Sequence, residues 1–184
     1  MQIPLNRFPA LLLMAALAGC LPQLPKDLAS PSPEMRPERF FAGDTEGRGQ
    51  LTMRGRASRP FKVTSRGSNE PDGSFRLDQT VAYEDGEIVR RTWRMRALDA
   101  RTYTGTVSDA SGEMHGTIEG NAFRLRYLIR QPTIYMEQWL YLQGDGRTVM
   151  NRAEVTILGI PWARLEERIV RLEGDSVEHS REAR

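Results

Sequence analysis

The chain has 184 residues, of which 26 are Lys or Arg and 24 are Asp or Glu, so its net charge at pH 7 is +2. This length suits one domain with tails. The near balance of charges gives no support for nucleic-acid binding. One cysteine and two histidines exclude an internal disulfide and a metal site rich in cysteine or histidine within one chain. No metal and no cofactor are predicted.

Residues 1–19 are predicted to be a lipoprotein signal peptide. Arg7 precedes an apolar run, residues 8–17, which is too short to span a bilayer and has the length of a signal-peptide core. The run ends in Leu17-Ala18-Gly19-Cys20. This motif resembles the bacterial lipobox, in which cleavage precedes the cysteine and the new terminus is acylated. The alternatives are an ordinary signal peptide and a cysteine buried in a core helix.

An acylated Cys20 would hold the mature chain at a membrane surface, because two or more acyl chains anchor a protein stably. Residue 21 is Leu. By resemblance to the enteric sorting rule, lipoproteins without Asp at this position reach the outer membrane. The expected location is therefore the periplasmic face of the outer membrane, with the membrane as a partner through the acyl chains.

Two segments outside the folded domain are predicted from their composition. Residues 20–38 contain five prolines, which disfavour a helix and favour an extended, semi-rigid tether. Residues 174–184 contain many charges and one apolar residue larger than alanine, Val177, so they are expected to form a disordered tail.

Residues 39–173 are predicted to form one all-β domain. It opens with Phe40-Phe41-Ala42-Gly43, and a strand at 61–64 follows the turn at Arg59-Pro60. Short alternating segments separated by glycine-containing turns then continue to residue 157, which is typical of an antiparallel meander.

Residues 75–83 and 88–97 form the hairpin with the clearest register. Apolar residues lie mostly at odd positions on both segments. A two-residue turn at Asp85-Gly86 would pair odd with even positions, whereas a three-residue loop at 84–86 pairs Leu77 with Trp93. We therefore predict the three-residue loop, with Gly86 in the left-handed conformation of a G1 bulge.

Two further turns bring apolar faces together. A four-residue loop at 109–112 would pair Tyr103 with Ile118 and Gly105 with Gly116, where two missing side chains would let the sheet bend. A two-residue turn at Gly120-Asn121 would pair Ile118 with Phe123.

The last part of the domain is less regular. Residues 134–142 are expected to turn their even positions inward and to pair Gln138 with Ala153. Residues 160–172 have apolar spacing compatible with either a helix or a strand, and a closing strand is preferred.

These residues together resemble a family of small Gram-negative lipoproteins with a domain of unknown function and a lipocalin-like fold. The matching features include Phe40-Phe41-Ala42-Gly43, Arg91-Thr92-Trp93, Tyr103-Thr104-Gly105, Gly120-Asn121-Ala122 and Trp139-Leu140-Tyr141. The resemblance implies a single up-and-down barrel in the cell envelope. Members of this type are often encoded near fatty-acid-modifying enzymes, which implies a lipid context.

Several polar residues are expected inside this barrel. The registers place Gln79 opposite Arg91 on the inner face, and Gln138 and Asn151 on the inner face of later strands. Buried polar groups must be paired or hydrated, so they could form the polar end of a cavity. The predicted ligand-binding residues are Gln79, Arg91, Trp93, Tyr103, Tyr127, Gln138 and Asn151. The alternative is that Gln79 and Arg91 satisfy each other inside a packed barrel.

No catalytic residue is assigned. Asp109, Ser111 and His115 are residue types found in catalytic triads, but the first two share a tight loop and His115 is expected on the outer face. The favoured function is a membrane-anchored lipoprotein that binds or carries a hydrophobic, lipid-derived ligand such as a fatty acid. A structural or interaction lipoprotein with a filled barrel is the second hypothesis, and an enzyme acting on lipid is the third.

Overall fold

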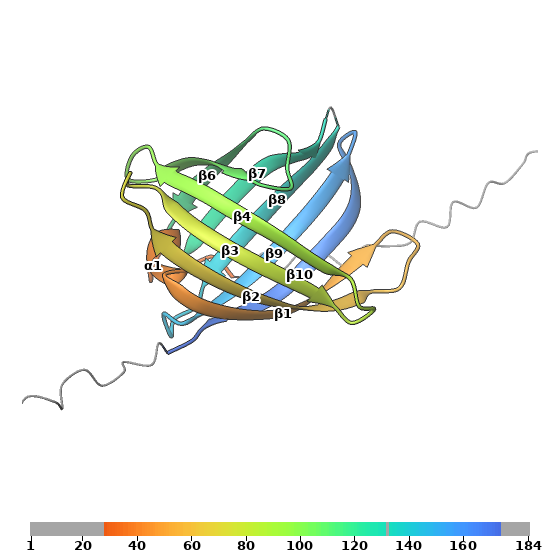
Figure 1. Ribbon diagram of the computed structural model, residues 1–184, viewed down its shortest axis with the longest axis horizontal. Coiled ribbons are helices and arrows are strands. Elements are labelled where there is room, and N and C mark those ends of the chain that lie inside the picture. Colours follow the sequence, from red (N-terminus) through yellow and green to blue (C-terminus); the bar gives the residue numbers. More distant parts are fainter. Residues whose placement is uncertain (1–27, 132, 174–184) are drawn as a thin grey trace, which may run out of the picture.

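The computed structural model describes residues 28–131 and 133–173. The predicted signal peptide, Cys20, residues 21–27 and the predicted tail at 174–184 lie outside the described residues. The elements are α1 (Pro37–Phe40), β1 (Gly43–Met53), β2 (Arg59–Asn69), β3 (Phe75–Tyr83), β4 (Ile88–Ala97), β5 (Thr102–Val107), β6 (Glu113–Glu119), β7 (Ala122–Arg130), β8 (Ile134–Leu142), β9 (Thr148–Ile157) and β10 (Ile160–Arg171) (Figure 1).

The ten strands of the described chain form one closed barrel in which each strand is antiparallel to its neighbours along the sequence. β1 pairs with β10 and closes the barrel, so no strand has a free edge. The predicted all-β, up-and-down barrel is confirmed. Residues 160–171 are a strand rather than a helix, as preferred.

Three predicted registers are confirmed. Leu77 pairs with Trp93 across β3 and β4, and Gln79 pairs with Arg91. Ile118 pairs with Phe123 across β6 and β7. Gln138 pairs with Ala153 across β8 and β9, with the even positions of β8 buried.

The predicted register between β5 and β6 is wrong by two residues. Tyr103 pairs with Gly116 rather than Ile118, and Gly105 pairs with Met114. The reason is a longer connection: Ser111 N donates to Leu128 O on β7, so the loop after β5 folds across the barrel wall. A shift of two residues keeps each side chain on its face, which is why the buried set is unaffected. Gly116 leaves room for the ring of Phe123 above it.

Residues 28–41 close one end of the barrel, which we call the base. Met35 is fully buried there, and its N–H donates to Gly120 O over 2.9 Å. Ser30 N donates to Asn121 Oδ1 over 2.7 Å. The predicted tether at 20–38 is therefore corrected for its described part: residues 28–38 pack on the barrel, and Pro37 begins a helical turn, a position where its missing N–H costs nothing.

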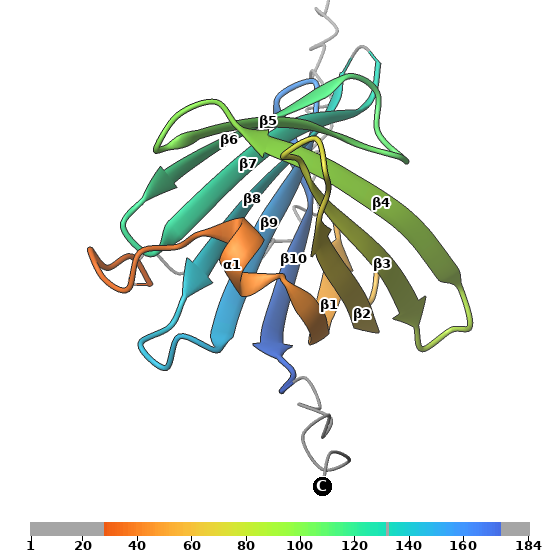
Figure 2. The ribbon, with the colours of Figure 1, turned by 60° about the vertical axis from the view of Figure 1, so that its left-hand side comes forward.

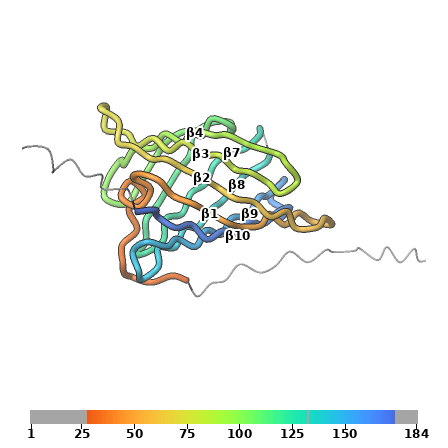
Figure 3. Tube along the Cα trace, turned by 60° about the horizontal axis from the view of Figure 1, so that its bottom comes forward, coloured from red at the N-terminus to blue at the C-terminus, as the bar shows by residue number. Residues whose placement is uncertain are grey.

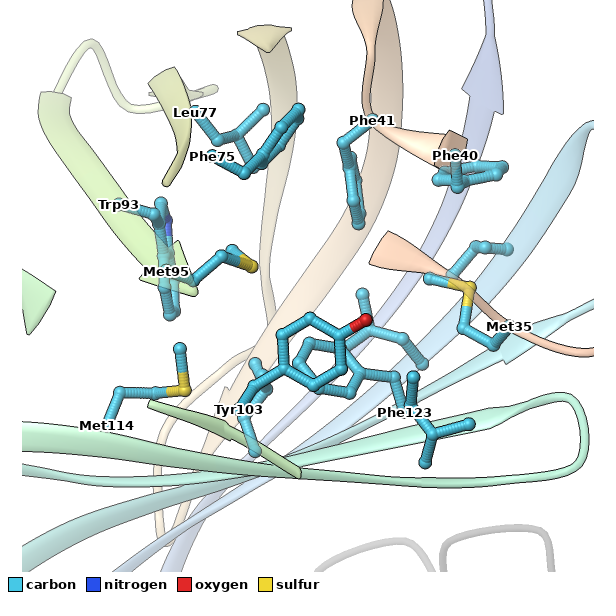
Figure 4. Packing of buried hydrophobic residues seen from close by; sticks show 14 of the residues in the cluster. Met35, Phe40, Phe41, Phe75, Leu77, Trp93, Met95, Tyr103, Met114 and Phe123 are labelled. Atoms are coloured by element: carbon cyan, nitrogen blue, oxygen red, sulfur yellow. The ribbon is translucent and has the colours of Figure 1, made fainter. Parts of the chain in front are cut away.

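The two ends of the barrel differ. Figure 2 shows α1 lying across the base, and Figure 3 shows the turn between β1 and β2 at the opposite end. Aromatic and Met side chains fill the base below α1 (Figure 4). Phe40 and Phe41 meet edge to face with their ring centroids 4.8 Å apart, and Tyr103 and Phe123 do so at 5.3 Å. The large core cluster therefore fills the base and continues along the barrel wall as far as Trp93 and Leu140.

No helix within residues 28–131 or 133–173 is long and apolar enough to cross a bilayer.

Gly86→Val should destabilise the domain more than Gly144→Val, by about 1–3 kcal/mol. Gly86 has a φ of +92°, a conformation in which a β-branched residue is strained, whereas no such φ occurs at Gly144. A Cβ at either position meets no atom within 4 Å, so the comparison isolates the backbone strain. Denaturant unfolding of the two variants measures the difference, and equal stabilities would contradict the strain argument.

Candidate functional site

The barrel interior holds a cavity of ≈ 260 Å³, which is lined from Phe41 at the edge of the base to Met53 and Trp162 at the opposite end. The residues that line the cavity come from β1, β2, β3, β4, β7, β8, β9 and β10. Each of these strands turns alternate side chains toward the barrel interior. Most of the lining is apolar and includes Leu51, Phe61, Val63, Leu77, Val81, Trp93, Met95, Leu125, Leu140, Val155 and Leu165. The polar lining residues are Gln79, Arg91, Gln138, Asn151 and Glu167, with Tyr83 contributing a hydroxyl group.

Gln79 is held by its neighbours on β2 and β4. Its Oε1 accepts a hydrogen bond from Trp93 Nε1 over 2.7 Å, and its Nε2 donates to Ser65 Oγ over 3.3 Å. These bonds fix the amide group against one wall of the cavity. The indole of Trp93 in turn meets the ring of Tyr127 edge to face, at 5.4 Å between centroids.

Arg91 brings a positive charge to the same wall. Its Nε lies 3.3 Å from Asp109 Oδ2 in the loop between β5 and β6, but this buried nitrogen makes no hydrogen bond of good geometry. The guanidinium also lies beside the Tyr127 hydroxyl, whose pKa burial raises to about 12. Arg91 and Gln79 therefore do not simply satisfy each other, as the packed-barrel alternative supposed.

Glu167 on β10 faces the cavity from the opposite side and was missed by the sequence analysis. It is 6% exposed, and its Oε2 accepts a hydrogen bond from Asn151 Nδ2 over 2.9 Å. Burial raises the pKa of Glu167 to about 7, although the Asn151 hydrogen bond and the charge of Arg91 act to lower it. A carboxyl group with this pKa exchanges its proton near neutral pH.

Two glycines on β1 make room for Glu167. A Cβ at Gly47 would lie 2.0 Å from Glu167 Oε1, and a Cβ at Gly49 would lie 2.9 Å from Glu167 Cα. Gly49 also pairs with Glu167 across the closure of the barrel. The alternation of Ala163, Leu165, Glu167 and Ile169 was the signal that could have placed this carboxylate inside.

Five of the seven predicted ligand-binding residues line the cavity: Gln79, Arg91, Trp93, Gln138 and Asn151. Tyr127 lies behind this lining, where its hydroxyl accepts a hydrogen bond from Gln138 Nε2 over 3.2 Å. The prediction for Tyr103 is corrected. It belongs to the base, where its hydroxyl donates to Glu38 Oε2 over 3.0 Å. The register of a strand determines whether a side chain points into the barrel or out of it, but not how far along the barrel axis the side chain lies.

The triad residue types do not come together. His115 is exposed on the outer face of β6, while Asp109 faces Arg91 from the loop. In the two described ranges, no group of three His, Cys, Asp or Glu side chains is arranged to hold a metal ion.

A model of the family described as "Protein of unknown function (DUF3833)" matches residues 14–171. The chain belongs to the DUF3833 family. The match spans the barrel and also the residues around Cys20. No curated protein matches this DUF3833 chain.

The DUF3833 barrel is similar in fold to several solved structures. The S-type phycobiliprotein lyase from Guillardia theta is 10% identical, with a TM-score of 0.59 over 74% of this chain and 91% of that one. Rv2717c from M. tuberculosis is 12% identical, with a TM-score of 0.57 over 76% and 99%.

A DUF3598 protein of unknown function from Nostoc punctiforme is 12% identical, with a TM-score of 0.54 over 73% of this chain and 48% of that one, so this chain spans about half of its length. These likenesses support the lipocalin-like fold that the sequence predicted.

Glu167→Gln should stabilise the protein more at about pH 8 than at about pH 5. The pKa of Glu167 is about 7 in the folded chain instead of the usual 4.5, so the folded state binds this proton more tightly than the unfolded state. The resulting stabilisation is fully present below pH 4.5 and is lost as the pH rises to about 7. Above that pH the buried carboxylate destabilises the wild type by at most about 3.5 kcal/mol, at roughly 1.4 kcal/mol per pKa unit.

Urea unfolding of wild type and variant at both pH values measures this effect. Glu166→Gln, on the neighbouring position of β10 and half-buried on the outer face, is the control for loss of a carboxylate. A stability difference for Glu167→Gln that is the same at both pH values would show that Glu167 does not titrate in this range.

Proposed function

We propose that this DUF3833 protein is a membrane-anchored lipoprotein of the periplasm that carries a hydrophobic, lipid-derived molecule inside its barrel. The observation that carries the proposal is the ≈ 260 Å³ cavity, which has mainly apolar walls and a few converging polar groups. This combination is typical of small-molecule binding sites. The cavity disfavours the alternative of a filled barrel, because a packed interior leaves few voids larger than a water molecule.

The size of the cavity limits the ligand. Its volume of ≈ 260 Å³ lies near the lower end, about 300 Å³, of ordinary ligand pockets. This space suits one acyl chain or a compact hydrophobic molecule rather than a lipid with two chains. The ligand's polar group would lie among Gln79, Arg91 and Gln138, since burying an unpaired polar group among the apolar walls is costly.

Exposed apolar side chains at the end opposite the base support a carrier function. Trp162 and Met53 line the cavity at the end opposite the base. Large apolar side chains remain exposed in the turns of this end and at the strand residues that follow them: Leu158 is 74% exposed, Ile160 56% and Ile88 55%. Exposed apolar groups around an opening would let a hydrophobic molecule enter without crossing a fully hydrated rim.

Cys20→Ala should abolish membrane anchoring and leave the barrel folded, because the proposed acylation site lies outside the barrel strands. Detergent phase partitioning of wild type and variant expressed in a Gram-negative host tests this, and circular dichroism of the purified variant tests the fold. Partitioning of the variant with the detergent phase would reject the lipid anchor.

Arg91→Met should keep the fold and lose retained acidic lipid. A buried ion can often be replaced by an apolar residue of similar length, and Asp109, which remains, has a side chain that is 36% exposed. A charge-assisted contact in a desolvated cavity contributes enough to lower affinity by roughly 10- to 100-fold when it is removed. Mass spectrometry of lipids that remain on gently purified protein measures the loss.

Arg90→Met is the matched control, because it removes the same charge from the exposed face of the same strand. Leu77→Trp, which fills the cavity wall without changing charge, should also reduce lipid uptake. A wild type that carries no lipid and binds no environment-sensitive fatty-acid probe would reject the carrier function and favour the filled-barrel hypothesis.

A further inference from the structure

Asn151 and Glu167 form a polar pair on the wall of the cavity that the proposed carrier function leaves unexplained. Both residues are more than nine-tenths buried and both line the cavity. Asn151 Nδ2 donates a hydrogen bond to Glu167 Oε2 over 2.9 Å. A buried polar pair in an apolar wall is costly unless its remaining groups also find partners.

Besides the second N–H of the Asn151 amide, the pair has two oxygens that can accept hydrogen bonds. Asn151 Oδ1 is buried and has no hydrogen-bond partner within the described chain. Glu167 Oε1 lies over Gly47, where the missing side chain leaves it room. The apolar residues nearby, Leu140 and Leu165, carry no hydrogen-bond donor in their side chains. Beside the cavity, this wall therefore keeps one buried acceptor that the described chain leaves unpaired, Asn151 Oδ1, and a second acceptor, Glu167 Oε1.

The charge of Arg91 limits what can approach these acceptors. Arg91 acts electrostatically on Glu167 across the cavity and lowers its pKa against the effect of burial. A cationic ligand at Glu167 would be repelled by this guanidinium. A neutral donor, such as a hydroxyl or an amide N–H, meets the requirement of the acceptors without that repulsion.

We propose that Asn151 and Glu167 bind a neutral hydrogen-bond donor on the ligand, so that the barrel selects a single-chain molecule with a hydroxyl or amide group over one without. This inference rests on the proposed carrier function and adds the chemical class of the ligand. An acidic group at Arg91 and a donor at Asn151 and Glu167 can belong to one molecule, because both positions line the same cavity.

The test compares decanol with decyl methyl ether, which have the same alkyl chain but differ in the hydroxyl donor. Affinities are measured by displacement of the neutral fluorescent probe N-phenyl-naphthylamine from the full chain in detergent-free buffer. Wild type should bind decanol roughly 10- to 100-fold more tightly than the ether, because the ether leaves the acceptors unpaired.

Variants test whether the preference for decanol depends on Asn151 and Glu167. Glu167→Leu and Asn151→Leu should each reduce the preference for decanol, since each removes acceptors from the pair. Glu167→Gln keeps an acceptor oxygen and should retain part of the preference. Leu77→Met, elsewhere on the cavity wall, should change both affinities by the same factor.

The possible outcomes distinguish this inference from the carrier function on which it rests. A preference that falls in Glu167→Leu and Asn151→Leu but not in Leu77→Met supports the inference. Equal binding of both ligands to wild type would overturn it and leave the carrier function standing. Binding of neither ligand, nor of the probe, would overturn the carrier function and this inference with it.

Discussion

The hydrogen bonds between β1 and β10 hold the barrel closed, and both its stability and its interior depend on this pairing. The contact joins strands that lie at opposite ends of the domain in sequence, with Thr45 opposite Arg171 and Met53 opposite Ala163. Without it, two long strands would present open edges, which invite pairing with other chains. Closure also fixes how far apart the opposite walls lie and therefore how much space remains between them.

The same pairing explains why a carboxylate can exist inside the barrel. β1 carries Gly47 and Gly49 where a larger residue would collide with Glu167 or with the backbone of β10. Glycines weaken a strand because they lose more conformational entropy on folding and offer no side chain to pack. β1 tolerates them because it is paired on both sides, with β2 and with β10.

The two ends of the barrel interior differ in how tightly side chains fill them. The base is filled by the large aromatic and Met cluster and is covered by residues 28–41, whose contacts with Gly120 and Asn121 tie the chain's entry to the turn between β6 and β7. Most of the cavity lies beyond this cover, toward Met53 and Trp162. A packed base can hold the fold while the open half exchanges its contents, since local stability need not be uniform.

Turn chemistry and alternation were enough to predict much of this arrangement. The three-residue loop ending at Gly86 placed Gln79 opposite Arg91, and the even positions of β8 placed Gln138 inside. The sequence could not predict how the loop after β5 bonds to Leu128, because that contact is tertiary. It also could not place Tyr103 at the base rather than in the cavity, since alternation sets the face alone.

The errors at the two ends of the domain have different causes. Prolines at 31, 33 and 37 favour extended chain locally, yet burial of Met35 and the backbone bond to Gly120 outweigh this preference. Glu167 was missed because residues 160–172 fit both a helix and a strand. Only the pairing of β10 with both β1 and β9 settles which side of that segment faces inward.

The place where the chain enters the barrel has a consequence for its orientation. The described chain begins at residue 28 and packs on the base, while the cavity lies toward the opposite end. Seven residues, 21–27, separate Cys20 from residue 28, and the eight steps from one Cα to the next can span at most about 28 Å. If Cys20 is acylated as proposed, the base is the end held near the bilayer and the entrance points into the aqueous space. The bound ligand would then be exchanged with a molecule that reaches the barrel from the aqueous space, and not with the membrane leaflet that holds the anchor.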